Sequence, residues 1–535
     1  MQFIESIPYH TLPLHSKLVK DYVHADAYLK PLYHHPPSLD GVLETAKERK
    51  FSQEKRQTLV QSLRSQYSGL TSGAMVRNNI EKLGLENSFT VTTGHQLCAY
   101  TGAAYFIYKI ASTINLARQL SEEDPKRNFI PVFWMASEDH DFEEISEVNF
   151  YGKQWKWEKE DTHYGKSPVG LLNPSTIALW ANEMRQYFRD EAKATSLLQI
   201  FEDAYKNNST LANATRQIVH ELFKEFGLVI IDGNDIELKK LFIPVLLEEI
   251  KTEASSRAVN KATDFLKQGG YSGQITPREV NLFYFDGNHA RLRVEKKGND
   301  FLAIGSELRW SEAEIINEIN EHPEKFSPNV VLRPVYQEMI LPNLAYIGGP
   351  AEVAYWLQLK GVFDHFNVSY PVVLVRSSVV TIQNSILEKI QKYDFSSTEY
   401  FTLTIEELTN RFLKVNDAHL IDFDAERKLI DDMMLILNEK AKQIDQQLVT
   451  QLSIENKNLH ESISKIAAKF TKSLKQKADQ DLKNLQRMKN TLFPNQILQE
   501  RIISCMDCFR FDESAIREII RVTNPLGSSL QMFKV

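Results

Sequence analysis

Two polar clusters, each placed directly after an apolar and β-rich run, most constrain the fold of this 535-residue chain. Residues 92–96 follow the run at 89–91, and residues 137–144 follow the run at 129–134. Between them, residues 103–120 carry apolar side chains at three- and four-residue spacing, which predicts a helix. The order strand, loop, helix, strand and loop is that of a βαβ unit. Both clusters would then lie beyond the carboxyl ends of parallel strands, where ligands bind in open α/β sheets.

Three further segments have the pattern of buried parallel strands. Residues 227–233, 344–347 and 371–375 are short, apolar and flanked by turn residues. Together with the first two runs they give about five parallel strands. This count predicts an α/β fold with a doubly wound parallel sheet.

The rest of the chain predicts additions to this sheet. Around Asp286-Gly287, two alternating runs predict a β-hairpin, and Ser311 with Glu314 predicts a capping box. Residues 437–474 carry an apolar heptad pattern, which is typical of a coiled coil. The polar run at residues 455–458 favours an antiparallel hairpin over one continuous helix.

These patterns divide the chain into eight parts. The predicted parts are a helical segment joining the core (1–87), the first part of the core (88–150), an insertion (151–210), the second part of the core (211–270), a small α+β insertion (271–330), the third part of the core (331–383), a helical coiled coil (384–495) and a segment returning to the core (496–535). One hairpin cannot cover its whole apolar stripe, so we expect a homodimer through the coiled coil. Changing Ile444 and Leu448 to Asp should weaken such a dimer.

Composition excludes several classes of protein. The formal net charge of −7 argues against charge-driven nucleic-acid binding. No apolar run approaches the ~18 residues of a membrane span, and the N-terminus lacks the pattern of a secretory signal. Three cysteines cannot form a disulfide framework. We therefore expect a cytoplasmic protein with no nucleic-acid or membrane partner.

Four segments of the chain resemble the bacillithiol biosynthesis cysteine-adding enzymes: residues 93–96 with the helix that follows, 131–144, 332–342 and 345–356. With the coiled coil, the resemblance spans most of the chain in the same order. It implies a Rossmann-like core with connecting-peptide insertions, related to class I aminoacyl-tRNA synthetases, and a C-terminal α-helical coiled coil. The implied ligase joins L-cysteine to glucosaminyl malate, the last step of bacillithiol biosynthesis. The family usually has a glutamine or similar polar residue where this chain has His95.

Joining a carboxylate to an amine requires activation, because a carboxylate is a poor electrophile. The usual route is attack on the α-phosphate of ATP, so ATP or another adenine nucleotide, with or without Mg²⁺, is the expected cofactor. Backbone N–H groups near glycines and helix starts suit phosphate. The predicted nucleotide-binding residues are Thr93, Gly94, His95, Gln96, Gly348 and Gly349. The alternative for the first cluster is a helix-entry turn with a solvent-facing histidine.

Asp139, His140 and His95 are the predicted catalytic residues, because a base must act on the attacking amine. The alternative for the acidic cluster is a helix N-terminus stabilised by its macrodipole. No metal site is predicted, since adjacent His and Asp do not have a metal-ligand spacing. The predicted substrate-binding residues are Glu138, Asp141, Arg333, Tyr346, Glu352, Tyr355 and Arg376, with either arginine as the partner of the malate carboxylates or in a surface salt bridge.

The cysteines offer weaker signals. Cys98 has no activating base in the sequence and is interpreted as a small buried thiol. Cys505 and Cys508 have a redox-like spacing but no second pair, so they are interpreted as structural or incidental. Two other functions stay open: another nucleotidyl-activating ligase on the same core, and a ligand-binding coiled-coil scaffold without activity.

Overall fold

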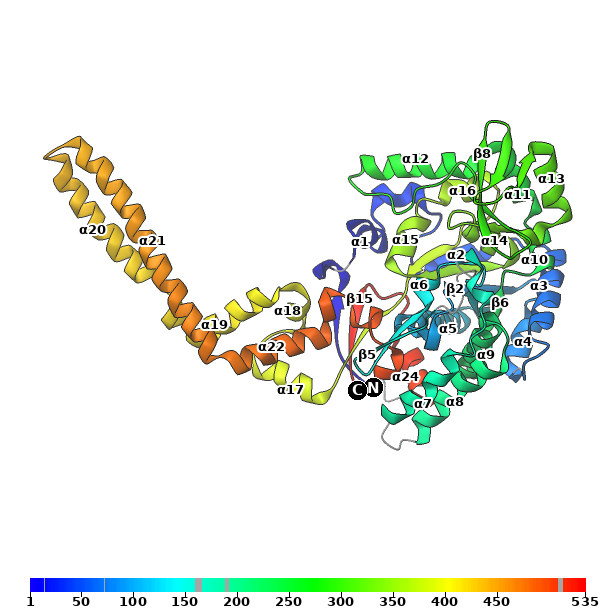
Figure 1. The fold of residues 1–535 in the computed structure, drawn as a ribbon, viewed down its shortest axis with the longest axis horizontal. Coiled ribbons are helices and arrows are strands. Elements are labelled where there is room, and N and C mark those ends of the chain that lie inside the picture. Colours follow the sequence, from blue (N-terminus) through cyan, green and yellow to red (C-terminus); the bar gives the residue numbers. More distant parts are fainter. Residues whose placement is uncertain (14, 72, 159–165, 188–191, 509–512) are drawn as a thin grey trace. The chain divides into compact units, whose positions relative to one another are not determined.

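A computed structural model describes residues 1–13, 15–71, 73–158, 166–187, 192–508 and 513–535. The chain forms two compact units (Figure 1). The first unit combines Met1–Thr381 with Gln499–Val535, and the second is Ile382–Leu498. None of the described helices is both long and apolar enough to cross a membrane.

A five-stranded parallel sheet forms the centre of the first unit, in the order β13-β12-β2-β3-β6. Its strands are β2 (Ser88–His95), β3 (Asn128–Met135), β6 (Val229–Asp232), β12 (Asn343–Gly348) and β13 (Val372–Val375). Nearly all their residues are buried, as expected when helices cover both faces. These are the five strands predicted from the sequence, and the predicted fold class is confirmed.

Helices connect and cover the strands. Helix α5 (Tyr105–Glu123) links β2 to β3, and together with α2 (Leu39–Glu48) it packs on a hydrophobic cluster that includes Val91 and Leu344. The other α-helices of the core are α1 (Lys17–Val23), α3 (Gln53–Gln66), α4 (Ala74–Lys82), α6 (Phe142–Ile145), α9 (Leu211–Phe223), α10 (Ile236–Lys240), α11 (Ile243–Thr252), α12 (Ala254–Gln268), α14 (Arg333–Ile340), α15 (Pro350–Trp356), α16 (Lys360–His365), α23 (Cys505–Cys508) and α24 (Glu513–Val522).

Two additions interrupt the core. The first contains the hairpin of β4 (Glu147–Phe150) and β5 (Lys153–Lys156), followed by α7 (Trp180–Met184) and α8 (Ala192–Asn207). The second is an antiparallel sheet in the order β10-β9-β8-β7-β11. It consists of β7 (Leu282–Phe285), β8 (Arg291–Lys297), β9 (Asp300–Ala303), β10 (Arg309–Ser311), α13 (Glu312–Glu321) and β11 (Phe326–Pro328). The predicted hairpin of β7 with β8 and the predicted capping box at Ser311 are both confirmed.

The two ends of the chain meet in a small sheet that the sequence did not predict. Strand β1 (Gln2–Pro8) pairs antiparallel with β15 (Ser529–Lys534), which also lies beside β14 (Ser378–Ile382). The sequence interpretation of residues 1–87 as a helical segment did not include this strand, although the rest of the segment is mostly helical. Its strand is short and mostly exposed, and its partner lies more than five hundred residues away, so no local pattern marks it.

The second unit is helical: α17 (Asn384–Lys392), α18 (Ser397–Thr402), α19 (Ile405–Ile421), α20 (Asp424–Lys442), α21 (Gln446–Lys477) and α22 (Asp479–Leu492). Helices α20 and α21 pair as the expected helical hairpin. Its turn, however, lies at residues 443–445 and not at 455–458, where Asp445 caps α21 by accepting the N–H of Gln447. The polar run continues inside α21, because glutamate and lysine favour helices. Ile444, assigned to the apolar seam, is 76% exposed at the turn.

Candidate functional site

A cavity of about 680 Å³ lies at the C-terminal edge of the parallel sheet. The ends of β2, β3 and β12 form one side of it, and residues of the β7–β11 insertion form another. A volume of this size is typical of sites for small molecules. Most of the predicted site residues line it: Gly94, His95, Gln96, Glu138, Asp139, His140, Arg333, Tyr346, Gly349, Glu352, Tyr355 and Arg376.

Three predicted site residues do not line the cavity. The fully buried Thr93 donates its hydroxyl to the carbonyl of Ile347 at 2.7 Å, which ties β2 to β12. Asp141 is exposed and caps α6 by accepting the N–H of Glu144 at 3.3 Å. Gly348 ends β12, and a Cβ there would lie 3.1 Å from the Cβ of Glu352. These residues shape the walls of the cavity without facing a ligand.

A buried ion pair lies at one end of the cavity. The ammonium of Lys109 is 2.6 Å from Oε2 of Glu352 and also donates to the carbonyl of Gly94 at 2.5 Å. Glu352 further accepts the hydroxyl of Tyr346 at 2.6 Å and the N–H of Gly349 at 2.8 Å. Burial opposes the charge of Glu352, but Lys109 and these donors outweigh it and lower its pKa to about 2. Glu352 is therefore an anion that already accepts three hydrogen bonds from the protein.

A second ionic group centres on Asp139. Its carboxylate accepts the side-chain amide of Gln96 at 2.7 Å and lies 3.1 Å from the guanidinium of Arg291. Burial acts to raise the pKa of Asp139, but Arg291 and Gln96 together hold it below its usual range. Arg291 also donates to the carbonyl of Pro328 at 3.0 Å, within its own insertion. Its ion pair with Asp139 joins the β7–β11 insertion to the loop after β3. This contact explains how the insertion closes the cavity.

The two predicted catalytic histidines are both neutral. Burial, followed by the nearby charge of Lys109, lowers the pKa of His95 to about 3. Its Nδ1 lies 3.0 Å from the carbonyl of Gln96, which can only accept, so we assign the proton to Nδ1 and a lone pair to Nε2. Burial and Arg291 likewise lower the pKa of His140. Both side chains can therefore accept a proton or a hydrogen bond, and neither supplies positive charge.

Several guanidinium groups also line the cavity. Arg376 is 2.6 Å from the buried Glu500, so its charge is already balanced. Arg333 stands over the rings of Trp134 and Tyr346 and has no carboxylate partner among the described residues. Its Nη2, like Nε of Arg293, is a buried donor without a hydrogen-bond partner in the described part of the chain. Buried donors that lack a hydrogen-bond partner favour the binding of an anionic ligand.

Comparison with known proteins supplies the family. Residues 3–377 match the family model described as "Bacillithiol biosynthesis BshC, N-terminal Rossmann-like domain", and residues 379–535 match "Bacillithiol biosynthesis BshC, C-terminal coiled-coil domain". The chain belongs to the BshC family. The resemblance predicted from four sequence segments is thereby confirmed, as are the Rossmann-like core and the coiled coil.

The similarity to known proteins extends over almost the whole chain. A Flavobacterium johnsoniae protein named "Putative cysteine ligase BshC" is 38% identical over 93% of this chain and 93% of its own length. Proteins of the same name from Christiangramia forsetii and Natranaerobius thermophilus are 35% and 28% identical over 96% and 95% of both chains. This shared name supports a ligase, the predicted enzyme class. A solved synthetase structure from Campylobacter jejuni matches at 11% identity with a TM-score of 0.21, which is too low to support a conclusion about the fold.

The structure of this BshC-family chain adds site residues that the sequence did not reveal. They are Tyr105, Lys109, Trp134, Glu144, Arg278, Arg291, Arg293 and Arg501. Lys109 had one visible signal: it is a charged residue inside the apolar stretch of α5. Arg291 and Arg293 alternate along β8, but nothing local indicates that this strand reaches the sheet edge. Arg501 comes from the far end of the chain and has no sequence signal.

Glu144 and Cys98 differ in what they can do chemically. Glu144 lines the cavity without an ion-pair partner among the described residues, and burial with nearby Asp139 raises its pKa. A carboxylate in this state suits proton transfer. Burial raises the pKa of Cys98 to about 12, so its thiol stays protonated. The side chain is only partly buried, whereas the sequence interpretation was a buried thiol. Cys505 is buried, and the side chain of Cys508 lies outside the described residues.

Proposed function

We propose that this BshC-family chain joins L-cysteine to glucosaminyl malate in the last step of bacillithiol biosynthesis, in the cytoplasm. The new bond is an amide between the carboxyl group of cysteine and the sugar amine. The observation that carries the proposal is a cavity at the sheet edge that is lined by both carboxylates and guanidinium groups, in a chain of this family. The two substrates bring the complementary charges: ammonium groups and carboxylates.

The arginines that line the cavity suit the malate group. Arg333 and Arg293 each keep a buried donor without a partner in the described structure, although Arg293 is also paired with Glu295. Arg278 lines the same cavity and has no carboxylate partner among the described residues. A dicarboxylate can accept two parallel hydrogen bonds from such groups. We assign malate to Arg333 in preference to Arg376, because Glu500 already balances the latter.

The carboxylates that line the cavity suit the reacting amine. The sugar amine must lose a proton before it attacks, and Glu144 is the cavity-facing carboxylate whose raised pKa fits a base. We assign Asp139 and His140 to orienting this amine, since Arg291 and Gln96 already fix Asp139 in place. The lone pair on Nε2 of His95 would accept a hydrogen bond from the cysteine ammonium.

Activation of the cysteine carboxylate requires a leaving group, which ATP or another adenine nucleotide, with or without Mg²⁺, would supply. The residues available for it are Gly94, Gln96 and Gly349 at the strand ends, together with Lys109. Unused hydrogen-bond donors support the binding of a nucleotide here. Lys109 can offer a third N–H beyond its two protein contacts, and Nη2 of Arg333 has no partner in the described structure. These cations would balance charge that develops on phosphate.

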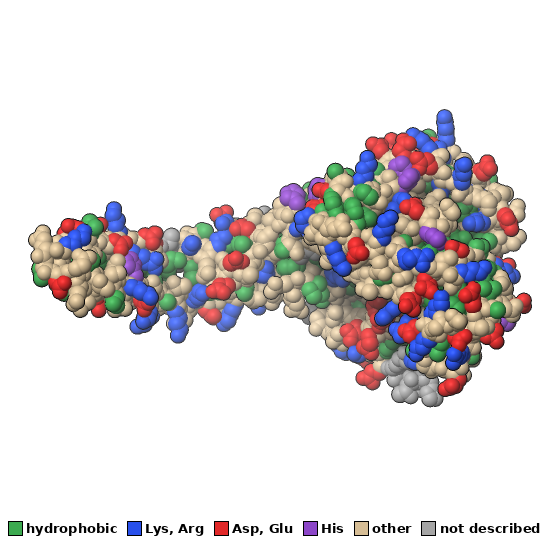
Figure 2. Space-filling model, turned by 90° about the horizontal axis from the view of Figure 1, so that it is seen from above, with side chains coloured by type: hydrophobic (Ala, Val, Ile, Leu, Met, Phe, Trp, Pro, Cys, Tyr) green, Lys and Arg blue, Asp and Glu red, His purple; other side chains and the backbone are tan. Residues whose placement is uncertain are grey.

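We also propose a homodimer formed through the coiled coil. Leu429, Met433 and Ile436 lie one turn or two apart on α20, and they are between 44% and 68% exposed. Hydrophobic side chains are visible among charges of both signs on this segment (Figure 2). An exposed apolar stripe at heptad spacing favours pairing with a second copy. In this dimer, each active site would be built mainly from one chain.

The test is a reconstituted reaction. The purified chain is incubated with L-cysteine and glucosaminyl malate, with and without ATP, and the product is identified by mass spectrometry. We expect bacillithiol only when all components are present. Arg333→Ala should raise the KM for glucosaminyl malate at least tenfold, whereas Arg309→Ala, on an exposed edge strand and paired with Asp300, should not. Equal effects of both variants, or no bacillithiol with the unmodified chain, would contradict the proposal.

A further inference from the structure

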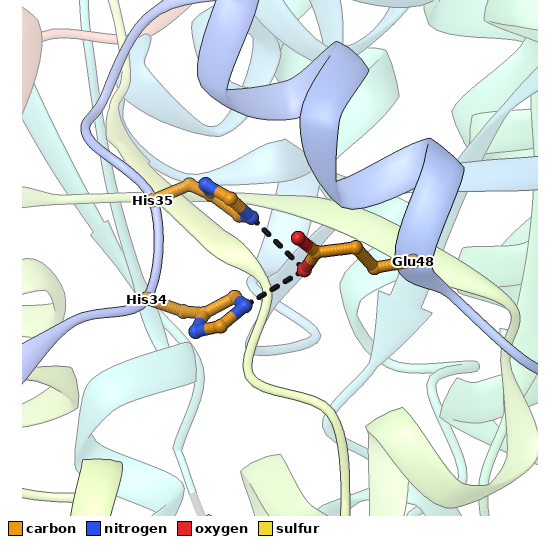
Figure 3. Close-up of side chains that lie close together, drawn as sticks. All are labelled: His34, His35 and Glu48. Atoms are coloured by element: carbon orange, nitrogen blue, oxygen red, sulfur yellow. Dashed lines mark hydrogen bonds and ion pairs between the residues drawn. The ribbon is translucent and has the colours of Figure 1, made fainter.

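Two histidines and one glutamate converge on the surface of the first unit, in a group separate from the cavity residues. His34 and His35 follow the short 3-10 helix η2 (Ala27–Leu32), and Glu48 is the last residue of α2. Figure 3 shows both imidazole rings pointing toward the same carboxylate. Nε2 of His34 lies 2.8 Å and Nε2 of His35 lies 3.1 Å from the same oxygen of Glu48.

This convergence is unusual within the described structure. Other histidines also lie near a carboxylate, but each does so alone: His365 with Glu248, His322 with Glu324, His460 with Asp431 and His140 with Asp139. The group at Glu48 is the one place among the described residues where three candidate ligand atoms lie within 4.8 Å of one another. A simple hydrogen bond needs one imidazole, so the second imidazole requires another explanation.

The spacing suits a small divalent cation. Around a tetrahedral Zn²⁺, with ligand distances of about 2.0–2.1 Å, neighbouring ligand atoms lie about 3.4 Å apart. The nitrogen-to-oxygen distances of 2.8 and 3.1 Å would have to open by only a few tenths of an ångström.

The backbone around each ligand is held in place. Arg49, next to Glu48, is buried and donates to the carbonyls of Glu338 and Leu341 at 2.6 and 2.7 Å, which anchors the end of α2. On the other side, Pro36 follows His35, and its carbonyl accepts the N–H of Ser38 at 2.8 Å. Little conformational entropy is therefore lost when these side chains coordinate an ion.

We propose that His34, His35 and Glu48 form a binding site for a divalent transition-metal cation of the Zn²⁺ class. Each residue supplies one ligand atom: Nε2 of His34, Nε2 of His35 and one carboxylate oxygen of Glu48. Two imidazoles with one carboxylate form a ligand set typical of Zn²⁺, and a fourth position stays open to water or to a further ligand. This site is independent of the proposed ligase reaction.

The test uses the full chain without an affinity tag, stripped with a chelator and titrated with ZnCl₂ by calorimetry. We expect the unmodified chain to bind one more equivalent of Zn²⁺ than the double variant His34→Ala/His35→Ala. Glu48→Gln should weaken binding at this site at least tenfold. Co²⁺ should give visible absorption with the intensity of a low-coordinate site in the unmodified chain alone.

His365→Ala is the matched control, because it removes an exposed histidine that has a single glutamate partner. It should leave the stoichiometry and the Co²⁺ spectrum unchanged. Thermal unfolding of each metal-free variant should match that of the metal-free unmodified chain, which separates loss of ligands from loss of fold. Equal Zn²⁺ stoichiometry in the unmodified chain and the double variant would overturn the proposal.

Discussion

Replacing Glu352 by Gln should destabilise the first unit, because it removes the anion that balances Lys109. The new side chain would also place an amide N–H or a carbonyl where the carboxylate now accepts three donors: Lys109, Tyr346 and the N–H of Gly349. One amide oxygen cannot replace them all. Lys109 is only 3% exposed, so its charge would remain buried without a partner.

The magnitude follows from the pKa of Glu352, which falls from 4.5 to about 2. At about 1.4 kcal/mol for each pKa unit, this shift corresponds to about 3.5 kcal/mol. Burial also lowers the pKa of Lys109, which offsets part of this gain. We therefore expect a loss of about 2–3 kcal/mol at pH 7. Since a lowered carboxylate pKa stabilises the fold above pH 4.5, the difference should shrink as the pH falls toward 2.

Tryptophan fluorescence during urea unfolding measures this effect selectively, because all six tryptophans lie in the first unit. The control is Asp364→Asn, which breaks an exposed i,i+4 pair with Lys360 and should cost less than about 1 kcal/mol. If Glu352→Gln costs no more than the control, or if its cost does not decrease between pH 7 and pH 3, the assignment of a stabilising buried pair is wrong.

Three further changes test the site and the assembly. Asp139→Asn should reduce bacillithiol formation at least tenfold and cost about 1–3 kcal/mol of unfolding free energy, because Arg291 loses its carboxylate partner; unchanged activity would exclude a role in the reaction. Glu144→Gln should lower kcat and remove the acidic limb of the pH–rate profile, which lies above pH 4.5. The same change should not destabilise the protein at pH 7, because the raised pKa of Glu144 means that the folded state disfavours its charged form. Leu429→Asp with Ile436→Asp should convert a dimer into a monomer in light scattering, and an unmodified chain that is already monomeric at tens of micromolar would refute the dimer.

The sequence predicted the sheet well because its strands carry their own signals. Each of the five parallel strands is a short apolar run that ends in polar or glycine residues, so burial on both faces is visible locally. Strand β1 and the turn of the coiled coil were missed for the opposite reason. The partner of β1 is remote, and a polar run such as residues 455–458 is equally compatible with a helix surface and with a turn.

The candidate site was predicted in part, for a related reason. The polar clusters at the ends of β2, β3 and β12 could be placed together because parallel strands share one edge. Arg291 and Arg501 reach the same cavity from an insertion and from the C-terminal segment, which only the tertiary fold brings there. Thr93 belongs to a predicted nucleotide-binding motif at the correct sheet edge, but its hydroxyl donates to a backbone carbonyl inside the sheet and does not face the cavity.

The most direct test of the central claim follows oxygen atoms from cysteine. L-Cysteine labelled with ¹⁸O in its carboxyl group is incubated with glucosaminyl malate, ATP and the purified chain, and the nucleotide products are examined by mass spectrometry. If the cavity activates cysteine by attack of its carboxylate on the α-phosphate, bacillithiol should form together with AMP that carries one ¹⁸O atom. Bacillithiol formed without ATP, or with ADP and unlabelled AMP, would contradict this account.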